Sequence, residues 1–96
     1  MGMHNPPHPG EFIAEIYLIP NGISGRELAQ STGVASSTLS RLLKGTSRVT
    51  PEMALRLSKA LRRSPESWLS MQDAFDLWNA RKRVDLRTVS KLKIAA

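Results

Sequence analysis

The hydroxyl and cationic side chains of one short segment have the types and spacing of a surface that binds a polyanion. A helix over about residues 35–44 is predicted, because Leu39, Leu42 and Leu43 recur on one face at helical spacing. The opposite face carries hydroxyl groups, two cations and no carboxylate, supplied by Ser36, Ser37, Ser40, Arg41 and Lys44. Hydroxyl groups donate hydrogen bonds and cations pair with phosphates, so this face indicates nucleic-acid binding.

The residues that precede this segment indicate how it is positioned. Ser24 and Glu27 have the spacing of a capping box, which predicts that a first helix begins at Ser24. Gly33 can adopt a positive φ in the turn that follows, and Gly45 can end the second helix in the same way. Residues 24–45 are therefore predicted to form a helix-turn-helix.

Three further helices are predicted around this pair. One begins near Pro9, carries Phe12, Ile13, Ile16 and Tyr17 at helical spacing, and is ended by Pro20, Asn21 and Gly22. The other two begin at Thr50 and Ser64, each of which is a good cap residue followed by a proline. The last helix extends to about Arg81.

The chain as a whole is expected to form one all-α domain of five helices. Its 96 residues, 41% of them hydrophobic, suffice for one modest core and are too few for two. Residues 1–7 are expected to form a flexible, proline-containing lead-in, and residues 8–81 a helix-turn-helix domain that ends in a dimerisation helix. Residues 82–96 form a basic tail, for which folding back, extending a dimer contact and remaining mobile are all open.

The net charge of +6 is unevenly distributed. Residues 24–63 hold eight Lys or Arg against two acidic residues, residues 64–80 hold three acidic residues alone, and residues 81–96 hold six basic residues against one acidic. The first basic block coincides with the predicted helix-turn-helix, which favours a polyanionic partner. A solvated helix face is the preferred interpretation of four later cations, Arg56, Lys59, Arg62 and Arg63.

The last predicted helix carries more large apolar residues than a small core can bury. They span more than one helix face, and large apolar patches rarely stay exposed on monomers. A symmetric dimer through this helix is therefore preferred over a purely internal core. The expected interface residues are Trp68, Leu69, Met71, Phe75 and Trp78.

Several classes of function are excluded by what the sequence lacks. The chain has no cysteine, and His4 and His8 stand beside prolines without a set of partner ligands, so neither a metal nor another cofactor is expected. No nucleophile with a base, phosphate cradle or catalytic carboxylate pair is present, so an enzyme is not expected. No leader or membrane-spanning run is found, and a cytoplasmic protein is expected.

Together the motifs HPGEFI, SGRELAQSTGV, STLSRLLKG, TPEMALRLSKAL and SPESWL resemble the HigA family of antitoxins. This family, also called virulence-associated protein I, lies within the lambda-repressor-like helix-turn-helix class, and the resemblance covers about residues 8–81. It implies a homodimer that binds double-stranded operator DNA, represses its own operon and neutralises a HigB-like toxin, an mRNA interferase. A phage-type or stand-alone repressor without a toxin is the alternative.

The resemblance also implies roles for single residues. Base contacts are expected from Ser36, Ser37 and Arg41. Phosphate contacts are expected from Ser24, Arg26, Thr38, Lys44, Thr46, Ser47 and Arg48. Many family members have longer side chains where this chain has Ser36 and Ser37, so specificity is expected to depend on Arg41 and guanine. Glu11 and Glu15 on the first helix offer a surface for a basic toxin.

Overall fold

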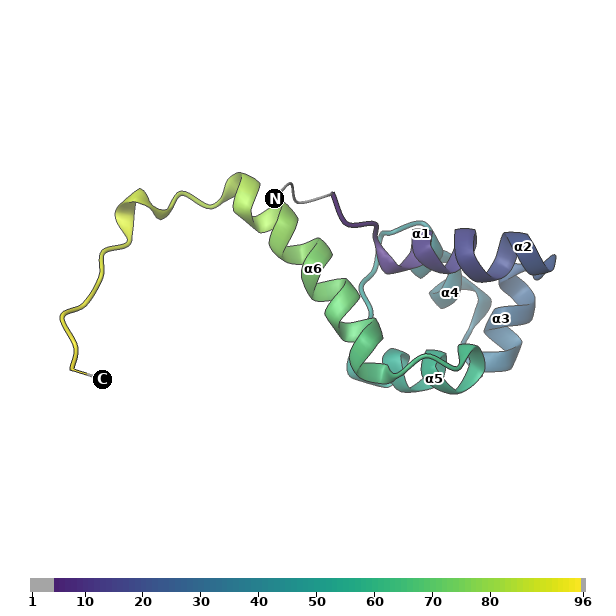
Figure 1. Ribbon diagram of the computed structural model, residues 1–96. Helices are drawn as coiled ribbons and strands as arrows, with labels where there is room; N and C mark the ends of the chain where they lie inside the picture. The colour runs from purple at the N-terminus through teal and green to yellow at the C-terminus, as the bar shows by residue number, and fades with distance from the viewer. Residues whose placement is uncertain (1–4, 96) are drawn as a thin grey trace.

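The computed structural model describes residues 5–95, and every regular element within that range is helical (Figure 1). This confirms the all-α class and the five predicted helices. His4 lies outside the described residues. The elements are α1 (Pro9–Ile13), which continues through η1 (Ala14–Leu18) and α2 (Ile19–Asn21), then α3 (Gly25–Thr32), α4 (Ser36–Leu43), α5 (Pro51–Leu61), α6 (Pro65–Arg83) and the short 3₁₀ turn η2 (Leu86–Thr88).

The first helix ends within the predicted segment of Pro20, Asn21 and Gly22. The helix continues to Asn21 and ends where Gly22 adopts φ 63°. Its middle part, η1, is a π-helix, in which each N–H donates to a carbonyl five residues back. This wider turn precedes Pro20, so the helix changes its hydrogen-bond register next to the residue that cannot donate.

The predicted helix starts are confirmed. The Nδ1 atom of His8 accepts a hydrogen bond from the Gly10 amide at 2.9 Å, so His8 caps α1. Thr50 and Ser64 cap α5 and α6 through their hydroxyl oxygens, and a proline occupies the first turn of both helices. The α6 helix ends at Arg83, two residues beyond the predicted end.

Trp68 lies at the centre of the core and is fully buried within the subunit. The rings of Phe12 and Tyr17 pack against it with centroid distances of 6.1 and 6.0 Å, which joins the first helix to α6. The rest of the buried apolar core is Ile13, Leu18, Leu28, Ala29, Leu39, Leu42, Val49, Ala54 and Leu57. The expectation that Trp68 lies in a dimer interface is therefore wrong.

Two of the four late cations have structural roles, so a solvated face is the wrong interpretation for them. Arg56 donates from Nη1 to the Thr32 carbonyl at 2.8 Å and so satisfies the end of α3. The guanidinium of Arg63 lies 4.9 Å from the centroid of the Phe12 ring, at cation–π distance. Both side chains connect α5 or its end to earlier helices.

The tail does not fold back onto the domain. It leaves the end of α6 in an extended path that leads away from the other helices (Figure 1), and residues 84–95 are all exposed. The molecule is consequently elongated, with extents of 53 × 26 × 26 Å. Among the described residues, no helix is long and apolar enough to cross a membrane.

Candidate nucleic-acid interface

The predicted helix-turn-helix is present, with α3 as its first helix and α4 as its second. Ser24 caps α3 by accepting from the Glu27 amide at 3.1 Å, and Glu27 accepts from the Ser24 amide at 2.9 Å. Gly33 adopts φ 73° and Gly45 adopts φ 79°, as their positions in the sequence predict. The capping box and both left-handed glycines are therefore confirmed.

A backbone contact between α1 and α4 fixes how α4 is presented. A Cβ atom placed on Gly10 would lie 1.9 Å from the carbonyl oxygen of Leu42. Only glycine allows this approach, because any side chain would collide with the backbone of α4. Leu39 and Leu42 lie on the inner face of α4 and are buried, as predicted. Sequence reasoning missed Gly10, although a glycine in the first turn of a helix was a signal.

The outer face of α4 is open to solvent. Ser36, Ser37, Arg41 and Lys44 are exposed, while Thr38 and Ser40 are half-buried. A groove of about 350 Å³ runs between the start of α3 and α4. It is lined by Gly25, Arg26, Ser36, Ser40, Leu43 and Lys44. The structure thus brings Arg26 of α3 beside Ser36 and Lys44 of α4.

The N-terminus of α4 adds a positive potential to this face. Ala35 occupies the cap position and provides no side-chain hydrogen bond. The amides of the first turn are therefore not satisfied by a capping side chain, and the positive end of the helix dipole lies beside Ser36 and Ser37. This arrangement suits the oxygen atoms of a phosphate.

Thr46 closes the C-terminal end of α4. Its amide and its hydroxyl both donate to the Arg41 carbonyl, at 3.0 and 3.1 Å. The hydroxyl proton of Thr46 is therefore used within the protein, whereas the exposed Ser24 hydroxyl accepts its cap bond and keeps its proton for another acceptor. Ser47 follows Thr46 and is half-buried.

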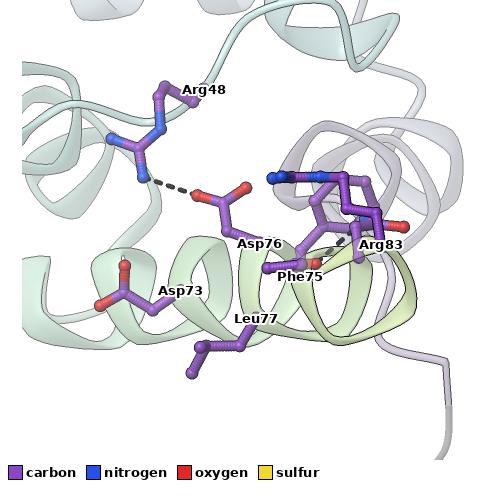
Figure 2. Close-up of a pocket in the computed structure, with 8 residues that line it drawn as sticks. Arg48, Asp73, Phe75, Asp76, Leu77 and Arg83 are labelled. Atoms are coloured by element: carbon purple, nitrogen blue, oxygen red, sulfur yellow. Dashed lines mark hydrogen bonds and ion pairs between the residues drawn. The ribbon is translucent and has the colours of Figure 1, made fainter. Parts of the chain in front are cut away.

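Arg48 is exposed but is held by α6 (Figure 2). Its Nη2 atom donates to Oδ2 of Asp76 at 2.6 Å. The buried Gln72 donates to Oδ1 of Asp76 at 3.0 Å and accepts from the Val49 amide at 2.8 Å. The hydrogen bond from Arg48 holds the pKa of Asp76 below its usual value. Sequence reasoning missed Gln72 and Asp76, whose i, i+4 spacing on α6 was the available signal.

The other four expected interface residues on α6 are partly covered by the subunit itself. Leu69 and Met71 pack against the core. The ring of Phe75 meets that of His8 at a centroid distance of 4.9 Å, and both Phe75 and Trp78 are half-buried. Leu77, which is not among the expected interface residues, is 52% exposed.

Two short helices joined by a tight turn, with the second presenting hydroxyls and cations to solvent, define a helix-turn-helix protein of the DNA-binding type. In agreement, the family model described as Helix-turn-helix matches residues 13–68. The chain is 44% identical over 92 residues to an uncharacterized HTH-type transcriptional regulator, YddM, of Escherichia coli (strain K12), covering 96% of this chain and 97% of that protein.

More specific relatives are antitoxins. The chain is 40% identical over 74 residues to antitoxin HigA-1 of Vibrio cholerae serotype O1, covering 77% of this chain and 70% of that protein. It is also similar to a solved structure of antitoxin GraA in complex with its operator, with a TM-score of 0.86, 38% identity and coverage of 98% and 97%. The chain belongs to the HigA family of helix-turn-helix antitoxins. This family consists of DNA-binding proteins and not of enzymes, as expected.

Proposed function

We propose that this chain is the antitoxin of a type II toxin–antitoxin system. It binds operator DNA as a dimer, represses its own operon and neutralises a HigB-like mRNA interferase. The observation that carries the DNA-binding part is the unobstructed outer face of α4, with its hydroxyls, its two cations and its uncapped N-terminus. The family membership supports the antitoxin part, and GraA has been solved with its own operator.

In the proposed complex, α4 lies in the major groove. Arg41 is the long base-reading side chain of α4, and its fork of donors fits the O6 and N7 atoms of guanine. Ser36 and Ser37 add short hydroxyl contacts, which suit several bases. Phosphate contacts come from the start of α3, where Ser24 and Arg26 lie, and from α4 and its following loop, where Thr38, Lys44, Ser47 and Arg48 are expected to contribute. The contact expected from Thr46 is not part of the proposal, because its amide and hydroxyl both donate to the Arg41 carbonyl.

The proposed dimer forms through α6. Leu77 and the exposed faces of the predicted residues Leu69, Met71, Phe75 and Trp78 supply its apolar contact. A two-fold axis there places the two α4 helices about 34 Å apart, in successive major grooves. The operator is then a palindrome with half-sites one helical turn apart.

Fluorescence anisotropy with the DNA upstream of the chain's own reading frame tests this proposal. We expect two chains per operator and much weaker binding to a scrambled duplex of equal length. If each half of the dimer makes about three phosphate contacts, log affinity falls with log salt at a slope of about −5. Equal affinity for both duplexes would contradict sequence-specific repression.

The first helix offers a surface for the toxin. Glu11, Glu15, Ile16 and Ile19 are exposed there, with Ile16 at 52% and Ile19 at 73%, which combines acidic and apolar groups suited to a basic partner. We expect co-purification with the product of the neighbouring reading frame, and loss of that complex in Glu11→Lys/Glu15→Lys. If the neighbouring product is harmless and does not bind, the chain is a stand-alone repressor.

A further inference from the structure

We propose that the part of the tail beyond α6, Val84 to Ala95, packs across α6 of a second copy of this chain and so clasps the dimer. From here on, the tail means these residues. The inference rests on the proposed dimer and extends it, because it assigns a partner to the segment that the fold leaves without one. On the second copy, the tail binds in the groove beside Leu77 and Phe75.

The tail exposes large apolar side chains that are not buried by the rest of its own subunit. Five of its large apolar side chains are 49–82% exposed, namely Val84, Leu86, Val89, Leu92 and Ile94. The backbone at Val84 and Val89 is extended. Leu86 begins the 3₁₀ turn η2, whereas Leu92 and Ile94 beyond that turn have the alternation that places apolar side chains on one side of an extended segment. Exposed apolar area of this kind favours contact with protein over water.

The subunit that carries the tail does not supply this contact. The tail continues away from the end of α6, on the side away from the helix-turn-helix (Figure 1). The match to GraA covers 98% of this chain, so the similarity extends into the tail. A second copy bound to α6 would lie close to the point where the tail begins, at the end of that helix.

The distribution of charge favours a dimer in which the two α6 helices run antiparallel and each tail crosses the α6 helix of the other copy. Residues 64–80 contain three acidic residues and no Lys or Arg, whereas residues 81–96 contain six basic residues and one acidic. When two such helices run antiparallel about a two-fold axis, the basic end of each copy lies against the acidic start of the other. Glu66 and Asp73 are exposed on that start.

A groove on α6 is available to the tail. It has a volume of about 720 Å³, and its apolar lining comes from Phe75, Leu77 and Ala80. Its polar lining comes from Asp73, Asn79, Arg83 and the Arg48–Asp76 ion pair, and Leu77 projects from α6 on the side away from Arg48 (Figure 2). The apolar residues of the tail suit the apolar part of this groove, and Asp73, which is not part of that ion pair, can pair with a cation of the tail.

The first experiment compares dimer dissociation by sedimentation equilibrium for the full chain, the chain ending at Arg83, and the full-length variant Leu86→Ser/Val89→Ser/Leu92→Ser. We expect the last two to dissociate at least about tenfold more readily. The control is Thr88→Ala, which changes an exposed polar residue of the same segment. Circular dichroism checks the fold of each variant, and little change is expected because residues 84–95 are all exposed.

The second experiment uses disulfide formation, because the chain contains no cysteine. Copies that carry only Leu77→Cys are mixed with copies that carry only Leu92→Cys and oxidised, because nine residues after Arg83 are enough for the tail to reach back along the second α6. We expect a 77–92 cross-link between copies, detected by mass spectrometry after digestion. A full-length monomer would refute the proposed dimer itself. Dimerisation unaffected by truncation would refute the clasp alone, and so would truncation that lowers only DNA or toxin affinity.

Discussion

Nη2 of Arg48 lies 2.6 Å from Oδ2 of Asp76, and this contact ties the loop after α4 to α6. The neighbouring Val49 amide is bound by Gln72 of the same helix. Both partners of the ion pair are partly exposed, so the pair adds little to stability. The pair instead orients the loop after α4, so the helix proposed to form the dimer positions the loop that follows the helix proposed to read DNA.

The pH dependence of the Arg48–Asp76 pair is the first prediction. Asp76 has a pKa below its unfolded value of about 3.9, so the charged pair favours the folded state above that pH and loses this effect as the pH falls through the folded pKa. We expect Asp76→Asn to lower the free energy of unfolding above about pH 5, with the difference from wild type shrinking below about pH 4. Thermal unfolding from pH 2 to 7 measures this.

Asp85→Asn is the matched control for that series. The pKa of Asp85 is also lowered, by Arg87, but these residues are two apart in the exposed tail and contact no core residue. We expect no change in unfolding from this variant. An Asp76→Asn difference that persists unchanged at pH 2 would show that the lost interaction is not the ion pair.

Loss of the amide of Gln72 is expected to destabilise the fold more than loss of the ion pair. Gln72 is 1% exposed, and Gln72→Leu leaves the buried Val49 amide without an acceptor. The cost is about 1 to 3 kcal/mol, which lowers the melting temperature by several degrees. Calorimetry of this variant and of Gln30→Leu, on the exposed face of α3, distinguishes the lost hydrogen bond from a general effect of leucine.

Gly10→Ala is expected to be among the most damaging single changes. The added Cβ collides with the Leu42 carbonyl, and α1 and α4 must separate, at a cost of about 3 kcal/mol or more. Gly22→Ala is the comparison, because Gly22 has open space around it and only its φ of 63° opposes alanine, for about 1 to 2 kcal/mol. Equal losses in chemical denaturation would mean that the two helices separate without cost.

Arg41 and Arg48 are expected to contribute differently to DNA binding. Arg41→Ala removes a base contact worth about 1 to 3 kcal/mol, so affinity falls for the operator and changes little for random DNA. Arg48→Ala removes a phosphate contact and weakens binding to both DNAs alike. Fluorescence anisotropy at constant salt separates these outcomes, and equal losses on both DNAs for Arg41→Ala would contradict base reading.

The local signals in the sequence were sufficient for most of the fold. Capping residues such as Ser24 and left-handed glycines such as Gly33 act through neighbours a few residues away, so their pattern defined the helices. What could not be predicted depends on distant partners. The approach of Gly10 to Leu42 and the reach of Arg48 to Asp76 require the packed arrangement of helices, which periodicity does not specify.

The same distinction explains the error at Trp68 and the omission of Leu77. A run of apolar residues at steps of three or four indicates that one side of a helix is covered. It does not indicate whether the covering residues come from the same subunit or from a second copy. The first helix covers Trp68 through Phe12 and Tyr17, and this contact spans more than fifty residues of sequence. The exposed Leu77 could be identified only once that inner side was known.

The short hydroxyls at the start of α4 also bear on how such regulators diverge. Ser36 and Ser37 are exposed, so in the proposed complex longer side chains there would alter base preference without disturbing the helices below. One or two codon changes would then suffice to give a duplicated gene its own operator. Sister systems in one cell could in this way acquire independent control.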